Sequence, residues 1–85
     1  MTLVLAPHVT IAEVPEGAVL LDETTGRYWQ LNDTGALALR RMLDGQSAED
    51  AVAALRREYP DAGEQVAHDV RALLTALRTA KLVVA

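Results

Sequence analysis

The chain has 85 residues, no cysteine, two histidines and a formal net charge of −4, with a sequence pI of about 4.9. This length predicts one domain spanning residues 1–85, with a thin core that buries about 60 to 65% of the surface of the unfolded chain. The missing cysteines exclude the common zinc and iron–sulfur sites, and the acidic balance argues against a function that neutralises phosphates, so we expect no metal, no cofactor and no nucleic-acid partner.

No part of the sequence predicts export or insertion into a membrane. The first seven residues, MTLVLAP, lack the positive region and the full apolar core of a secretory signal. No apolar run approaches the roughly 20 residues that are needed to span a bilayer. We therefore expect a cytoplasmic protein without a membrane partner.

Three runs near the N-terminus have the composition of β-strands. His8 to Val14 carries β-branched residues between two prolines, which cannot donate to a ladder and mark its ends. Ala18 to Leu21 is apolar, and Arg27 to Leu31 follows a polar turn that contains Gly26. The simplest arrangement is an antiparallel meander with the apolar run as its middle strand.

Two amphipathic helices are predicted to follow the third strand. Asn32 can cap a helix from about Asp33 to Leu43, in which apolar residues recur at helical spacing. Ser47 can cap a second helix, which Pro60 ends because the residue before a proline avoids helical geometry. The third strand therefore leads directly into the first helix.

A third helix is predicted from about Gln65 onward. Asp61 and Glu64 have the spacing of a capping-box variant at its start. Its apolar face comprises Val66, Val70, Leu73, Leu74 and Leu77. The tail, Leu82 to Val84, is too short to stand alone and is expected to pack back on the core. Three strands before three helices predict an α+β domain resembling a winged helix-turn-helix.

The ionisable residues form no pattern that is typical of an enzyme. His8 precedes a strand, His68 lies on the polar flank of the third helix, and no Gly-x-Ser-x-Gly motif is present. Adjacent acids such as Glu49 and Asp50 are explained by the helix dipole, which favours negative charge in a first turn. The sequence therefore predicts a protein that is not an enzyme.

DNA binding is an alternative function, because many winged helix-turn-helix proteins are transcription factors. Their recognition helices usually carry Arg, Lys, Asn or Gln in basic surroundings. Here the second helix starts Ser47-Ala48-Glu49-Asp50, and the third mixes Glu64 and Asp69 with Arg71. A DNA-binding regulator is therefore disfavoured but stays open.

The third strand suggests a different function, which is peptide binding. It is an edge of the predicted meander, and Arg27 to Leu31 contains neither the Pro nor the Lys that usually protects an edge. Such an edge can accept a strand from another chain, whose backbone then supplies affinity while side-chain pockets supply specificity. The same edge can also pair with its own copy, so a monomer and an edge-strand homodimer both stay open.

The expected binding groove lies between the third strand and the third helix. Its predicted walls are Tyr28, Val66, Val70 and Leu73, and its charged rim is Arg27 and Asp69. The complete set of candidate peptide-binding residues is Arg27, Tyr28, Trp29, Gln30, Leu31, Val66, Asp69, Val70 and Leu73. Strand alternation places Tyr28 and Trp29 on opposite faces of the sheet. For each of the two, packing against the core or a neighbouring strand explains an aromatic side chain as well as peptide binding does.

The stretch LLDETTGRYWQLNDTGALALRRMLDG resembles the PqqD-like family, whose small members recognise precursor peptides in ribosomal natural-product pathways. The matching elements are the acidic turn with Gly26, the pair Tyr28-Trp29, the dipeptide Leu31-Asn32, Thr34-Gly35 and the helix that follows. The resemblance implies a winged helix-turn-helix-like fold. It also implies non-catalytic binding of the leader segment of a precursor peptide, added as a strand beside Arg27 to Leu31.

The length of the chain narrows the resemblance further. A free-standing domain looks most like the discrete leader-binding protein of lasso-peptide pathways. For that branch the resemblance implies two protein partners, a separate leader peptidase of cysteine-protease type and an ATP-dependent macrocyclase. In the other branch of the family, a PqqD-type peptide chaperone serves a radical-SAM enzyme, and this alternative stays open.

Overall fold

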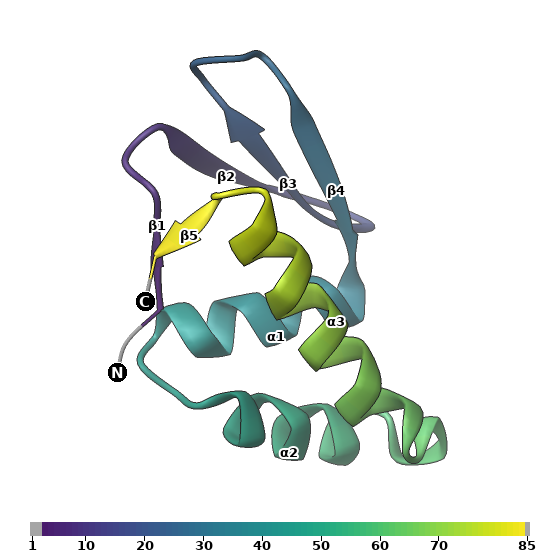
Figure 1. Cartoon of the computed structure of the whole chain (residues 1–85). Helices are drawn as coiled ribbons and strands as arrows, with labels where there is room; N and C mark the ends of the chain where they lie inside the picture. The colour runs from purple at the N-terminus through teal and green to yellow at the C-terminus, as the bar shows by residue number, and fades with distance from the viewer. Residues whose placement is uncertain (1–2, 85) are drawn as a thin grey trace.

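A computed structural model describes residues 3–84, apart from the side chain of residue 62. Its elements are β1 (Val4–Leu5), β2 (Val9–Val14), β3 (Gly17–Asp22), β4 (Tyr28–Asn32), α1 (Asp33–Leu43), α2 (Ala48–Glu58), the 3₁₀ turn η1 (Pro60–Ala62), α3 (Gln65–Thr79) and β5 (Val83–Val84). The predicted α+β class is confirmed, with the sheet first and the helices after it (Figure 1).

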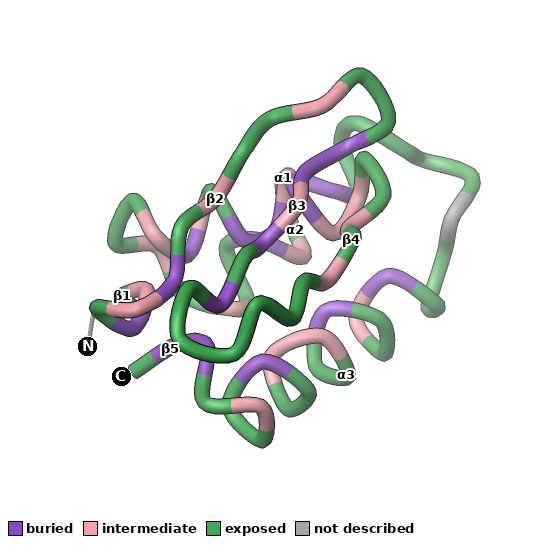
Figure 2. Tube along the Cα trace, turned by 90° about the horizontal axis from the view of Figure 1, so that it is seen from above, coloured by how far each residue is buried: buried purple, intermediate pink, exposed green. Residues whose placement is uncertain are grey.

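Strands β2, β3 and β4 form the predicted antiparallel meander, in the order β2-β3-β4. Leu20 of the middle strand lies opposite Ile11 of β2 and Trp29 of β4. Its side chain is fully buried, whereas the neighbouring Leu21 is exposed, so the sheet has an inner and an outer face. Along β4 the exposed and intermediate colours alternate in the same way (Figure 2).

The hydrophobic core lies between the inner face of the sheet and the helices. Helix α1 packs on β3 and β4, and α2 packs on α1 and α3 farther from the sheet (Figure 1). The largest fully buried side chains are Leu20, Leu39, Val70 and Leu82, which come from β3, α1, α3 and the segment before β5. Every layer of the fold therefore contributes to one core.

Helix starts follow the predicted caps in two of three cases. Asn32 Oδ1 accepts a hydrogen bond of 2.9 Å from the Gly35 N–H, and Ser47 forms a capping box with Asp50. The predicted capping box of α3 is wrong, because Asp61 lies inside the η1 turn and Glu64 makes no capping hydrogen bond.

The two ends of the described chain meet in a second, two-stranded sheet. Strand β1 pairs antiparallel with β5, with Leu5 opposite Val83. The Ala6 N–H also donates to the Leu82 carbonyl at 2.9 Å, and both Leu82 and Val83 are buried. The tail packs on the core as expected, but its strand pairing was not predicted.

Among residues 3–84, no helix combines the length and the apolar character that a membrane crossing requires.

Candidate peptide-binding groove

Strand β4 forms an edge of the three-stranded sheet. Within the described range it pairs with β3 only, with Leu31 opposite Ala18 and Trp29 opposite Leu20. The Asp22 N–H donates to the Arg27 carbonyl at 2.9 Å, which marks that opposed pair as hydrogen-bonded.

Hydrogen-bonded pairs alternate along an antiparallel ladder, so the main-chain groups of Trp29 and Leu31 also point to β3. The N–H and C=O groups of Tyr28 and Gln30 consequently point to the free edge. This edge is therefore ready to pair with another strand.

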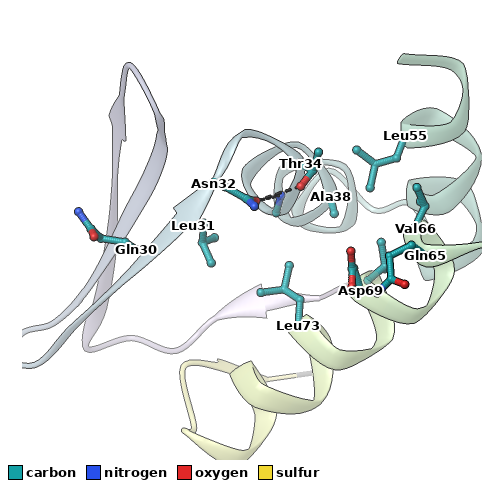
Figure 3. Close-up of a pocket in the computed structure, with 12 residues that line it drawn as sticks. Gln30, Leu31, Asn32, Thr34, Ala38, Leu55, Gln65, Val66, Asp69 and Leu73 are labelled. Atoms are coloured by element: carbon teal, nitrogen blue, oxygen red, sulfur yellow. Dashed lines mark hydrogen bonds between the residues drawn. The ribbon is translucent and has the colours of Figure 1, made fainter. Parts of the chain in front are cut away.

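A cavity of about 650 Å³ opens beside the free edge, between β4, the start of α1 and α3 (Figure 3). It is lined by Gln30, Leu31, Asn32, Thr34, Gly35, Ala38, Leu55, Gln65, Val66, Asp69, Val70 and Leu73. Side chains from the sheet and from all three helices thus meet around one opening.

The walls of the cavity are mostly apolar. Leu73 projects from α3 toward Leu31 of β4 (Figure 3), and both are half-buried. Val66 and Val70 are 6% and 2% exposed, so they belong to the core as well as to the cavity. Such a surface suits an apolar side chain of a ligand.

The rim of the cavity is polar and carries one ionisable group. Asp69 is exposed and accepts a hydrogen bond of 3.0 Å from the Gln65 side-chain amide. Asn32 Oδ1 is already used by the Gly35 N–H and, at 3.0 Å, by the Thr34 hydroxyl. Among the side chains that line the cavity, Asp69 is the only charged one.

Gly35 keeps the cavity open at the start of α1. A Cβ atom there would lie 3.2 Å from Asn32 Oδ1, 3.6 Å from Leu31 Cβ and 3.8 Å from Leu73 Cδ2. A side chain at this position would consequently reach both walls. In the sequence, Gly35 stands out only as part of the Thr34-Gly35 element of the family resemblance. The structure shows in addition that its missing side chain leaves space in the cavity.

Six of the nine predicted site residues are brought together. Gln30, Leu31, Val66, Asp69, Val70 and Leu73 all line the cavity. Their roles in binding stay predictions.

The three remaining candidates lie elsewhere on β4 and just before it. Tyr28 is 66% exposed and lies on the outer face, so its predicted place as a groove wall is wrong, although its main chain lies at the free edge. Trp29 is half-buried on the inner face, and the guanidinium carbon of Arg27 lies 5.7 Å from the centre of its ring. Neither Arg27 nor Trp29 lines the cavity.

Several lining residues were not predicted: Asn32, Thr34, Gly35, Ala38, Leu55 and Gln65. The first three had a signal, because the helix cap at Asn32 and the glycine after Thr34 place the start of α1 against the end of β4. Leu55 comes from α2, and nothing in its helical spacing distinguishes it from other core residues.

The hairpin that joins β3 to β4 is fixed by Asp22, which is 7% exposed. Its Oδ1 atom accepts hydrogen bonds from the Thr24 hydroxyl at 2.7 Å and the Thr24 N–H at 2.9 Å. The hydroxyl bond is the main reason why the pKa of Asp22 is lowered, with smaller contributions from the N–H groups of Thr24 and Thr25 and from His8.

Within residues 3–84, no cluster of three or more His, Cys, Asp or Glu side chains could hold a metal ion.

Residues 17–83 match the family model described as coenzyme PQQ synthesis protein D (PqqD). This range contains β3, β4, all three helices and the whole cavity lining. The chain belongs to the PqqD family. No curated protein matches it significantly.

Two solved structures are similar to this PqqD-family chain over nearly its whole length. One is a lasso peptide synthetase B1 complexed with the leader peptide, with a TM-score of 0.87, 38% identity and 100% coverage of both chains. The other is TbiB1 in complex with the TbiA(beta) leader peptide, with a TM-score of 0.80 and 29% identity, covering 98% of this chain and 94% of TbiB1. Both structures confirm the predicted fold.

Proposed function

We propose that this protein binds the leader segment of a ribosomally made precursor peptide in a lasso-peptide pathway. The leader adds as a strand along the free edge of β4 and sets an apolar side chain into the cavity between β4 and α3. The observation that carries this proposal is the free edge directly beside the cavity, in a chain 38% identical to a lasso peptide synthetase B1 complexed with the leader peptide.

The two parts of the groove divide affinity and specificity. Tyr28 and Gln30 offer main-chain donors and acceptors to any strand, and each hydrogen bond is worth about 0.5 to 1.5 kcal/mol net. The cavity distinguishes sequences, because burying one medium apolar side chain is worth about 1.5 to 3 kcal/mol. A leader with a suitable apolar residue therefore binds more tightly than an arbitrary extended peptide.

The role we propose is recognition without catalysis, by a single domain spanning residues 1–85. Asp69 is the only ionisable residue lining the cavity, and Thr34 is the only hydroxyl. A hydrolytic site needs a nucleophile held by a base and a third orienting group, and these two side chains do not supply that set. The bound leader is presented instead to a cysteine-protease-type leader peptidase and to an ATP-dependent macrocyclase.

The family match also keeps a second candidate, a peptide chaperone for a radical-SAM enzyme, because the matching model is that of PqqD. The two functions differ in the enzyme that receives the peptide. Co-purification of the tagged protein with a cysteine-protease-type peptidase supports the lasso pathway, and co-purification with a radical-SAM enzyme supports the second candidate.

Isothermal titration with the leader of the cognate precursor, identified from neighbouring reading frames, tests peptide binding. We expect one site per chain and the same affinity with and without EDTA. Backbone amide shifts concentrated at Tyr28, Gln30 and the cavity would support strand addition at β4. Shifts confined to β2, the other edge of the sheet, would refute it.

A further inference from the structure

A second hollow lies on the other side of the end of β4. It has a volume of about 300 Å³ and is lined by Val14, Glu16, Ala18, Gln30, Leu31 and Asn32. Gln30, Leu31 and Asn32 line the cavity beside α3 as well, so the two hollows flank the same stretch of strand. The Gln30 side chain projects away from α3, toward the outer side of the sheet (Figure 3).

The turn between β2 and β3 brings a carboxylate to this place. Gly17 lies opposite Asn32, and a Cβ atom on Gly17 would come within 2.0 Å of the Leu31 carbonyl oxygen. The residue has a φ of 148°, which L side chains rarely adopt, so only glycine allows this close approach. Glu16, the residue before it, is therefore held beside the end of β4.

Glu16 differs from Glu13, the other glutamate of the β2–β3 hairpin, in forming no ion pair with any residue of the described range 3–84. Glu13 forms an ion pair with Arg40 of α1. None of the residues that line the second hollow is basic. The hollow thus combines an apolar surface at Val14 with one exposed carboxylate and the Gln30 amide.

We propose that this hollow is a second subsite, which takes a lysine or arginine of the bound peptide next to the apolar anchor. The proposal rests on the proposed function, because it needs a strand paired with β4. Consecutive residues of a strand point to opposite faces, so a peptide with one side chain in the α3 cavity directs its neighbours to the outer side. A long basic side chain places its aliphatic stem on Val14 and its charged group beside Glu16.

The expected contribution is modest because Glu16 is exposed. Ion pairs between exposed groups change an equilibrium by roughly 1.5- to 5-fold, and salt weakens them. The subsite therefore selects among leaders that already carry the apolar anchor, and it does not replace the anchor.

Selection from a phage library of random twelve-residue peptides tests the proposal. Wild type, Glu16→Lys and Glu23→Lys are used as three separate targets. Glu23 is an exposed glutamate in the β3–β4 turn, whereas Glu16 lies in the turn before β3. The two residues flank opposite ends of β3, so replacing Glu23 is the matched control for the change of charge.

We expect wild type and Glu23→Lys to enrich peptides in which Lys or Arg directly precedes or follows a common apolar residue. With Glu16→Lys, the apolar residue should persist while its neighbour changes to Asp or Glu. One peptide selected on the wild-type protein is then synthesised with and without the basic residue beside its apolar residue. Replacing that lysine with alanine should weaken binding to the wild-type protein by roughly 1.5- to 5-fold and should not weaken binding to the Glu16→Lys protein.

Peptides with the apolar residue but no charge preference beside it, on all three targets, would overturn the second subsite and leave the proposed function intact. If no peptide is enriched on folded wild-type protein, both proposals fail.

Discussion

Leu73→Ala is expected to weaken binding of the cognate leader, whereas Leu74→Ala should leave it unchanged. The two leucines are neighbours on α3 and both are half-buried. Only Leu73 lines the cavity, where it faces Leu31, whereas Leu74 lies beside Leu3 and Met42 on another side of the helix. The pair therefore separates the loss of a groove wall from the general effect of shortening a leucine on this helix.

The size of the effect follows from the apolar surface that Leu73 covers. Complete burial of a medium apolar leader side chain is worth about 1.5 to 3 kcal/mol, and the loss of one wall re-exposes part of it. A loss of about 1 to 2 kcal/mol corresponds to a Kd roughly 5- to 30-fold higher. Isothermal titration measures this change directly.

Both substitutions also affect folding, and this must be measured separately. A fully buried Leu→Ala change costs about 2 to 5 kcal/mol, and a half-buried one costs less. Circular dichroism and a cooperative urea melt show whether each variant is folded during the titration. Val70→Asp is a poorer test, because Val70 is 2% exposed and a carboxylate there would be buried in the core.

One result would refute the placement of the peptide. If folded Leu73→Ala binds the leader with wild-type affinity, the cavity beside α3 does not hold the anchor. Equal weakening by Leu73→Ala and Leu74→Ala would instead indicate a general effect on α3, and the role of the cavity as a specific site would be lost.

Gly35→Leu should weaken leader binding by at least about 10-fold in titration, because its side chain fills the space between Leu31 and Leu73. Duplex DNA should bind only nonspecifically, and a nanomolar affinity that falls steeply with salt would revive the regulator alternative. A homodimer formed through β4 would use the same main-chain groups that the leader needs. Saturating leader should therefore give a complex of one leader and one protein chain, measured by light scattering. A dimer that still carries bound leader would refute β4 as the edge shared by both. Asp22→Asn should be less stable than wild type at pH 7, and this deficit should become smaller as the pH falls below 4, in urea melts at pH 7 and pH 3.

The sign of the pH effect follows from the direction of the pKa change. The pKa of Asp22 is lowered below its ordinary value of 3.8, chiefly because the Thr24 hydroxyl donates to the carboxylate. The folded state therefore holds the proton less tightly than the unfolded state does. The resulting stability is fully present above pH values near 4 and is lost as the pH falls through the lower, folded pKa. A deficit of Asp22→Asn that stays constant from pH 7 to pH 3 would contradict this role.

The order of elements could be predicted because each boundary has a local physical cause. Asn32 both ends β4 and caps α1, so the predicted helix, Asp33 to Leu43, agrees with the structure. The pairing of β1 with β5 could not be predicted, since two-residue strands are too short to show a periodicity. The start of α3 was assigned the wrong cap because Pro60 opens a 3₁₀ turn that includes Asp61.

The groove could be predicted in outline but not in its details. An unprotected edge strand and an apolar helix were visible in the sequence. Alternation required Tyr28 and Trp29 to face opposite sides, but it could not decide which one faces inward. That choice depends on the register, in which Trp29 lies opposite the buried Leu20 and Tyr28 opposite the exposed Leu21.

The burial of the groove residues limits how the specificity of this site can change. Val66 and Val70, the buried valines that line the cavity and form its floor, also belong to the hydrophobic core. Polar or much larger residues at these positions would therefore destabilise the fold. Leu31 and Leu73 are half-buried, and Glu16 and Asp69 are exposed, so replacing them costs less folding stability. In the proposed binding mode the edge of β4 pairs through main-chain groups, and such pairing is indifferent to most side chains. Differences in leader preference between related proteins should therefore arise at these half-buried and exposed positions, while the valines of the floor stay apolar and similar in size.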